Sequence, residues 1–202
     1  MLQGGKKLAA VLESGKRPES FEEAYGEIEL IAGLYGSEAR AVWDFIKSSD
    51  IRSVVEIGRY FGTGVFMMSC AARKLERFLS IDIVSRPMIE DPMRVWAERN
   101  GFDLELVVCD SKKYEPDAEL HWDFVFIDGG HTGETVTNDL EKFRRSTKFI
   151  GFHDFADNGS RNRHKRVYRD VVEAISAARD KYGWELAWPR GRSEVIFRTG
   201  VK

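Results

Sequence analysis

The spacing of hydrophobic positions changes near residue 50 of the chain. Before this point apolar side chains recur at helical spacing, as at Phe21, Tyr25 and Ile28. From Ser53 onward, short apolar runs rich in β-branched residues alternate with amphipathic stretches. This alternation is typical of a mostly parallel sheet with helices on both faces. We therefore predict a single domain, in which a helical segment at residues 1–50 packs on an α/β unit at residues 51–202.

The α/β unit begins with five predicted strands that are separated by helices. The strands are expected at about residues 53–57, 77–83, 104–108, 122–127 and 149–152, and the helices at about 63–75, 87–100, 132–143 and 167–182. Two further strands, at about 184–188 and 194–198, are expected on either side of a turn with proline and glycine.

A glycine-rich turn, EIGRYFGTG at residues 56–64, follows the first strand. Glycines let the backbone approach a ligand, and the first turn of the following helix offers free N–H groups. In open α/β sheets this turn is where nucleotide-like cofactors bind. Tyr60 stands where a dinucleotide fingerprint would have its second glycine. The acidic Glu56 inside the strand suits a cationic ligand better than a pyrophosphate.

Polar residues also follow the second and third strands. Asp82, at the end of the second strand, is placed to accept hydrogen bonds from the ribose hydroxyls of an adenosine cofactor. This role is compatible with either NAD or S-adenosylmethionine. Asp110 and Ser111 follow the third strand and, taken alone, are equally a turn signal.

Chemically reactive side chains follow the fourth and fifth strands. The fourth strand ends in Asp128-Gly129-Gly130-His131, and the fifth ends in His153-Asp154. Since the carboxyl ends of neighbouring parallel strands meet at one edge of a sheet, we expect these carboxylates and imidazoles to converge on the ligand crevice.

Two of these segments resemble a known family. The pattern E-x-G-x-x-x-G-x-G resembles motif I of class I S-adenosylmethionine-dependent methyltransferases, and D-F-V-F-I-D-G-x-H is similar to a segment of small-molecule O-methyltransferases, the macrocin and sugar O-methyltransferases among them. The resemblance implies a Rossmann-like, seven-stranded, mostly parallel sheet of order 3-2-1-4-5-7-6. It also implies the cofactor-binding residues, which are Glu56, Gly58, Tyr60, Gly62, Thr63, Gly64, Asp82, Asp110, Ser111 and Asp128.

The resemblance further implies the catalytic groups and a cation. His131 corresponds to a histidine that acts as general base, with Asp128 beside it in the site. Asp128 and a pair after the fifth strand, here His153 and Asp154, would hold a divalent cation such as Mg²⁺ or Mn²⁺. His153 departs from the family, which more often has a carboxylate there. Two carboxylates with an imidazole suit Mn²⁺, Fe²⁺ or Zn²⁺ better than Mg²⁺.

These features predict methylation of a small-molecule hydroxyl, on a sugar or a secondary metabolite. An NAD-dependent oxidoreductase would explain the glycine turn and Asp82 but not the D-G-G-H segment or the terminal strand pair. A catalytically silent protein that binds S-adenosylmethionine to regulate a partner is the second alternative. An RNA methyltransferase is not expected, because the chain lacks a broadly basic balance.

Composition adds few constraints. The formal net charge of −2 gives no signal for nucleic acid or a membrane, and no apolar run approaches the roughly 20 residues that span a bilayer. Cys70 and Cys109 are expected to be buried thiols in a reducing compartment, the cytoplasm. The basic segment at residues 161–166 is either a solvated loop or a lid that meets an acidic or phosphorylated acceptor. The oligomeric state stays open.

Overall fold

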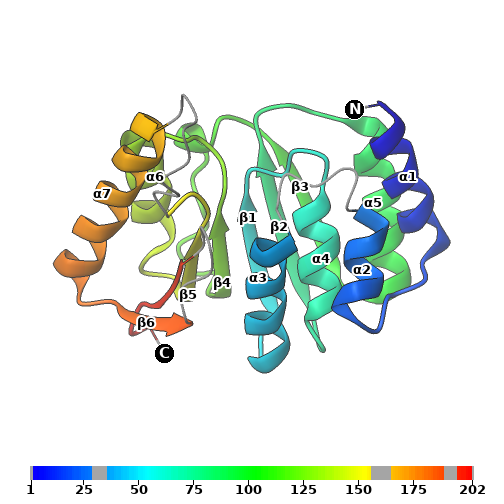
Figure 1. Ribbon diagram of the computed structural model, residues 1–202, viewed down its shortest axis with the longest axis horizontal. Helices are drawn as coiled ribbons and strands as arrows, with labels where there is room; N and C mark the ends of the chain where they lie inside the picture. The colour runs from blue at the N-terminus through cyan, green and yellow to red at the C-terminus, as the bar shows by residue number, and fades with distance from the viewer. Residues whose placement is uncertain (1, 29–35, 156–164, 189–194, 202) are drawn as a thin grey trace.

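The protein forms one seven-stranded sheet with helices on both faces (Figure 1). A computed structural model describes residues 2–28, 36–155, 165–188 and 195–201. The strands are β1 (Ser53–Ile57), β2 (Arg77–Asp82), β3 (Asp103–Val108), β4 (Trp122–Ile127), β5 (Thr147–Phe152), β6 (Glu185–Trp188) and β7 (Val195–Arg198). Their order in the sheet is β3-β2-β1-β4-β5-β7-β6. Strands β1 to β5 are parallel, and β7 is antiparallel to both β5 and β6, so the predicted fold class is confirmed.

Seven α-helices of the described chain cover the two faces of this sheet. They are α1 (Leu2–Ser14), α2 (Phe21–Ile28), α3 (Gly36–Ser48), α4 (Thr63–Ala71), α5 (Pro87–Asn100), α6 (Gly133–Phe143) and α7 (Lys165–Tyr182). Helices α1 to α5 share one hydrophobic core with the sheet, and α6 and α7 share the other. Helix α4 is shorter than expected because the backbone becomes extended at Ala72.

The side chains of β1 alternate between the two cores. Val54 belongs to the core under α1 to α5, whereas Val55 and Ile57 belong to the core under α6 and α7. Since successive side chains of a strand point to opposite faces, Glu56 points to the same face as Val54. This face is the one that α4 covers.

The N-terminal helices share the first core. Leu8 and Leu12 of α1 are fully buried and belong to the same cluster as Trp96 of α5. Helix α1 lies along α5 at one end of the molecule (Figure 1). Helix α3 packs against α4, and this contact brings its first turn toward the carboxyl edge of the sheet.

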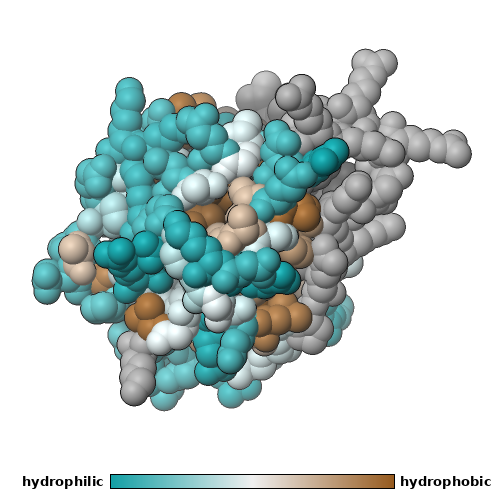
Figure 2. Space-filling view, turned by 90° about the vertical axis from the view of Figure 1, so that its left-hand side faces the viewer, coloured by the Kyte–Doolittle hydropathy of each residue, from teal (hydrophilic) through white to brown (hydrophobic). Residues whose placement is uncertain are grey.

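The molecular surface over α6 and α7 is mostly hydrophilic, with small separate hydrophobic patches (Figure 2). None of the described helices has both the length and the apolar character needed to cross a membrane. The basic segment at residues 161–166 lies outside the part of the chain whose side chains the structure describes. Its predicted role as a lid or a solvated loop therefore stays a prediction.

Candidate active site

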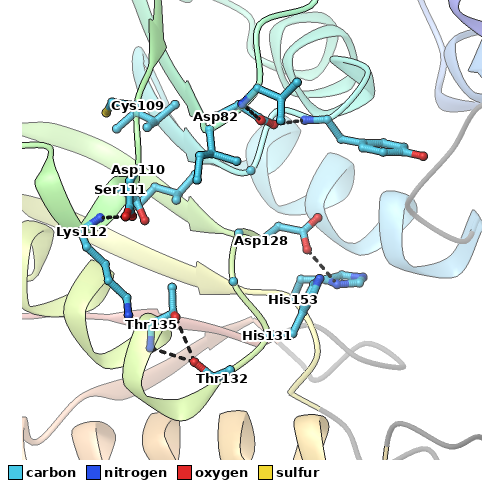
Figure 3. Close-up of a pocket in the computed structure, with 18 of the residues that line it drawn as sticks. Asp82, Cys109, Asp110, Ser111, Lys112, Asp128, His131, Thr132, Thr135 and His153 are labelled. Carbon is cyan, nitrogen blue, oxygen red and sulfur yellow. Dashed lines mark hydrogen bonds and ion pairs between the residues drawn. The ribbon is translucent and has the colours of Figure 1, made fainter.

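A cavity of about 970 Å³ opens at the carboxyl ends of the parallel strands. Residues that follow β1, β2, β3, β4 and β5 line it, and they face a common space in Figure 3. The predicted residues among its lining are Gly58, Tyr60, Asp82, Asp110, Ser111, Asp128, His131, His153 and Asp154. Glu56, Gly62, Thr63 and Gly64 lie behind this wall rather than in it.

Glu56 is held away from the cavity, under the start of α4. Its carboxyl accepts a hydrogen bond from Ser80 Oγ at 2.7 Å, and burial raises its pKa to about 8. A Cβ added at Gly64 would lie 1.8 Å from Glu56 Oε1. Gly64 is thus required by the buried acid itself, and the predicted contact of Glu56 with the cofactor stays a prediction.

Asp82 lies in the cavity wall as expected and also shapes the glycine turn. Its carboxylate accepts the backbone N–H of Tyr60 at 2.7 Å and that of Val84 at 2.8 Å. An ionised carboxylate has about four acceptor positions, so capacity for two ligand hydroxyls is left. Tyr60 has a φ of 49°, a left-handed conformation that this hydrogen bond helps to hold.

A buried ion pair supports the same turn and was not anticipated from the sequence. Arg59 is 2% exposed and lies 2.8 Å from Glu90 of α5, and it also donates to the Ser80 carbonyl at 2.8 Å. The sequence feature that could have pointed to this ion pair is the presence of an arginine inside the glycine motif. Gly58 completes the turn: its φ is 100°, and a Cβ there would lie 2.1 Å from the Asp128 carbonyl oxygen.

The loop after β3 carries Asp110 and Ser111 and is fastened to α6. Asp110 caps the short 3-10 turn η1 (Ser111–Lys113) by accepting the N–H of Lys112 at 3.0 Å. Lys142 of α6 donates to the carbonyls of Ser111 and Lys112, each at 2.8 Å, and also to the Tyr114 carbonyl. No local pattern pointed to Lys142, because its partners lie about 30 positions away along the chain.

Cys109 was expected to be a buried thiol, and this prediction is wrong. It is only half-buried and lines the cavity, whereas Cys70 is buried as expected. The reason is that β3 is an edge strand of the sheet. Burial raises the pKa of both thiols.

His131 and Asp154 form a close pair at the cavity wall. His131 Nδ1 lies 2.5 Å from Asp154 Oδ2, and this contact raises the pKa of His131. Burial alone would raise the pKa of Asp154, but its contacts with His131 and His153 lower it well below its usual range. Asp154 has a φ of 59°, a strained conformation of the kind that clusters at functional sites.

His153 lies among three carboxylates. Its Nδ1 is 3.1 Å from Asp128 Oδ1 and 3.1 Å from Asp154 Oδ1, and its Nε2 is 3.3 Å from Oε2 of Glu38 (Figure 3 shows Asp128 and His153 together). Burial lowers the pKa of His153, but the three carboxylates outweigh burial and raise it. Glu38 comes from α3, and no sequence pattern pointed to it.

The donor atoms in this corner fit a divalent cation. His153 Nδ1 is buried and has no hydrogen-bond partner, although a carboxylate oxygen lies 3.1 Å away on each side. Adjacent donors of one cation lie about 3 Å apart when each bond is about 2.1 Å long. Donor atoms of Asp128, His131 and Asp154 also lie within 4.8 Å of one another. The predicted set of Asp128, His153 and Asp154 is thus compatible with a cation, and His131 is a neighbouring donor.

Known structures share the fold of the seven-stranded sheet described above. A putative caffeoyl-CoA O-methyltransferase from Staphylococcus aureus is 11% identical, with a TM-score of 0.66, and the match covers 97% of this chain and 99% of that one. The SAH-bound methyltransferase PaMTH1 from Podospora anserina is 13% identical, with a TM-score of 0.66 and coverage of 94% and 92%. The O-methyltransferase TomG from Streptomyces achromogenes, in complex with SAM, is 14% identical, with a TM-score of 0.56 and 92% coverage of both chains.

The sequence itself identifies the family. No curated protein sequence matches the chain. A family described as a methyltransferase domain matches residues 55–155, which include the glycine turn, Asp82, Asp110, the D-G-G-H segment and Asp154. The NAD-dependent oxidoreductase is thereby excluded as an interpretation. The chain belongs to the methyltransferase-domain family, and its predicted class, a methyltransferase with the S-adenosylmethionine-dependent class I fold, is confirmed.

Proposed function

We propose that the protein transfers the methyl group of S-adenosylmethionine to a hydroxyl of a small molecule. The observation that carries this proposal is the His131–Asp154 pair, which faces the cavity beside Asp128. Transfer to oxygen requires a group that takes the hydroxyl proton. His131 contacts Asp154 through Nδ1, so its Nε2 is the nitrogen left to serve as the base.

Asp154 positions this base. Its Oδ2 holds His131 Nδ1, which fixes the orientation of the ring, and its charge stabilises the imidazolium that forms when His131 takes the proton. The same division of roles operates in other carboxylate–histidine pairs of enzymes. In the proposed site, S-adenosylmethionine supplies an activated methyl group. The residues that hold it are Asp82 at the ribose and Asp110 with Ser111 at the adenine, all of which line the cavity.

A divalent cation is the second element of the proposal. Asp128, His153 and Asp154 would hold it, and it would lower the pKa of the acceptor hydroxyl. The described cations in the cavity wall already have partners, since Lys112 pairs with Glu134 and Arg86 lies 3.5 Å from Asp82. The expected contact of residues 161–166 with an acidic or phosphorylated acceptor stays a prediction.

The test is methyl transfer from radiolabelled S-adenosylmethionine to a panel of catechols, sugars and hydroxylated metabolites, with and without Mn²⁺ or Mg²⁺. The His131→Ala variant is expected to lose at least 100-fold in kcat while it keeps its affinity for S-adenosylhomocysteine, because general-base catalysis contributes about 10²–10⁴-fold. His121→Ala is a matched control, since His121 is exposed and outside the cavity.

Unchanged turnover in His131→Ala would refute the base assignment. Binding of S-adenosylmethionine without turnover on any acceptor would instead favour a catalytically silent, regulatory protein. Thermal unfolding gives an independent readout of binding, because a ligand at about 100 times its Kd stabilises the folded state by about 2.7 kcal/mol.

A further inference from the structure

Glu38 is a buried carboxylate that comes from the N-terminal helices, outside the residues matched by the methyltransferase family. It lies in the first turn of α3 and is 2% exposed. Burying a carboxylate is costly unless the charge is compensated. The N-terminus of α3 provides part of this compensation through its dipole, and His153 Nε2 provides a hydrogen-bond donor at 3.3 Å.

This contact determines which nitrogen of His153 faces the cavity corner. A carboxylate only accepts hydrogen bonds, so Glu38 selects the form in which Nε2 carries the proton. The other nitrogen, Nδ1, then faces Asp128 and Asp154, and it is the nitrogen that gives up its proton when a divalent cation binds there. Nδ1 has no hydrogen-bond partner of its own in that space.

A carboxylate that accepts the far N–H of an imidazole is the usual outer partner of a metal-binding histidine. Such a partner fixes the orientation of the ring and makes its free nitrogen a better ligand. Glu38 is placed to have both effects on the ring of His153, because its carboxylate is buried and because its helix, α3, packs against α4 rather than extending into solvent.

We propose that Glu38 is a positioning residue: by holding His153 Nε2, it directs His153 Nδ1 toward Asp128 and Asp154 and increases the affinity of this corner for a divalent cation. The inference rests on the cation site of the proposed function. It gives the N-terminal helical segment a direct role in the active site. It also explains how a histidine can serve at a position where the family more often has a carboxylate.

The experiment is a titration of the full chain with Mn²⁺, in which free Mn²⁺ is followed by electron paramagnetic resonance. Glu38→Gln is isosteric and is expected to bind Mn²⁺ about 10-fold more weakly than the wild type, and Glu38→Leu about 100-fold more weakly, since loss of an outer partner costs about 10–100-fold in metal affinity. Asp44→Asn is the matched control, because Asp44 lies on the same helix and pairs with Arg40 on the surface. It is expected to bind Mn²⁺ as the wild type does.

Affinity for S-adenosylhomocysteine, measured in the same variants, separates a local effect from loss of the fold. Weaker Mn²⁺ binding with unchanged S-adenosylhomocysteine binding supports the role of Glu38. If Glu38→Leu does not fold, Glu38→Gln decides: Mn²⁺ affinity equal to that of Asp44→Asn would overturn the inference. A wild-type protein that binds no Mn²⁺ would overturn it as well, whereas the methyl-transfer assay would still test the proposed function on its own.

Discussion

Glu56 is a carboxylic acid enclosed between β1 and α4, with Ser80 Oγ as its hydrogen-bond donor. The burial that raises its pKa to about 8 means that the folded protein keeps this group protonated at neutral pH. In the unfolded chain the same group ionises near its ordinary value of 4.5. The two states therefore differ in bound protons between about pH 4.5 and 8.

This difference predicts a specific pH dependence of stability. Below pH 4.5 both states are protonated, and the group adds no pH dependence. As the pH rises toward 8 the unfolded state loses this proton first, so the free energy of unfolding decreases by up to about 1.4 kcal/mol per pH unit from this group. Chemical denaturation of the wild type and Glu56→Gln across this range is the measurement. The variant is expected to lose this part of the decrease, and parallel curves for the two proteins would contradict the assignment.

The imidazole of His153 allows a prediction about which metal the site prefers. An imidazole suits Mn²⁺ better than Mg²⁺, which prefers oxygen donors. Replacing it in His153→Asp gives the corner three carboxylates together with Asp128 and Asp154. We expect the variant to gain Mg²⁺ affinity relative to Mn²⁺, as measured by isothermal titration calorimetry with each metal. An unchanged Mn²⁺ to Mg²⁺ ratio would show that His153 does not contact the cation.

Helix α6 connects two parts of the site. Its first turn follows the loop of His131, and Lys142 near its C-terminal end is fastened to the loop that carries Ser111. The positions of the proposed base, His131, and of the proposed adenine contact, Ser111, thus both depend on α6. A shift of α6 would change their positions together.

Lys142→Met tests this connection. The change removes a charged donor from three carbonyl oxygens, so we expect the KM for S-adenosylmethionine to rise about 10-fold and the free energy of unfolding to fall by about 1–3 kcal/mol. The kcat at saturating cofactor is expected to change little, because Lys142 does not line the cavity. Lys181→Met is the control: Lys181 is exposed on α7. A fall in kcat with an unchanged KM would contradict the proposed positioning of the loop.

The N-terminal helices complete the core on one face of the sheet. Leu12 of α1 is fully buried, as is Trp96 of α5, and both belong to one cluster. Leu140 of α6 is equally buried but belongs to the cluster on the opposite face. The two cores share the strands between them.

We therefore expect the chain to unfold in one cooperative transition. Leu12→Ala and Leu140→Ala should each lower the free energy of unfolding by about 2–5 kcal/mol, because each leaves a cavity in a buried core. Differential scanning calorimetry should show both variants shifting the same single transition. Two transitions, of which Leu12→Ala shifts only one, would mean that residues 1–50 fold as a separate unit.

Local patterns were sufficient to predict the elements and the edge of the sheet where the site lies. Val54, Val55 and Ile57 mark a buried strand, and the glycines after it mark the turn, through rules that depend on neighbouring residues only. The same rules placed Asp82 and Asp128 at strand ends, and the structure brings both to the cavity. The family resemblance supplied the strand order, which the sheet confirms.

Contacts between distant segments were not predictable in this way. Arg59 finds Glu90 on α5, and His153 lies against Glu38, 115 positions earlier in the chain. Each partner depends on how a helix packs against the sheet, and that packing is a property of the complete core rather than of any local pattern.

Periodicity and strand ends are local properties of the chain, and they were enough to predict an α/β fold, the glycine turn and the carboxyl edge at which Asp82, Asp128, His131 and Asp154 gather. Three contacts became known from the folded chain alone: Glu56 points to α4 and away from the cavity, Asp154 holds His131 while His153 faces Glu38, and Lys142 binds the loop of Ser111. A side chain's partners depend on which faces of distant elements pack together, and this packing is set by the complete core rather than by neighbouring residues.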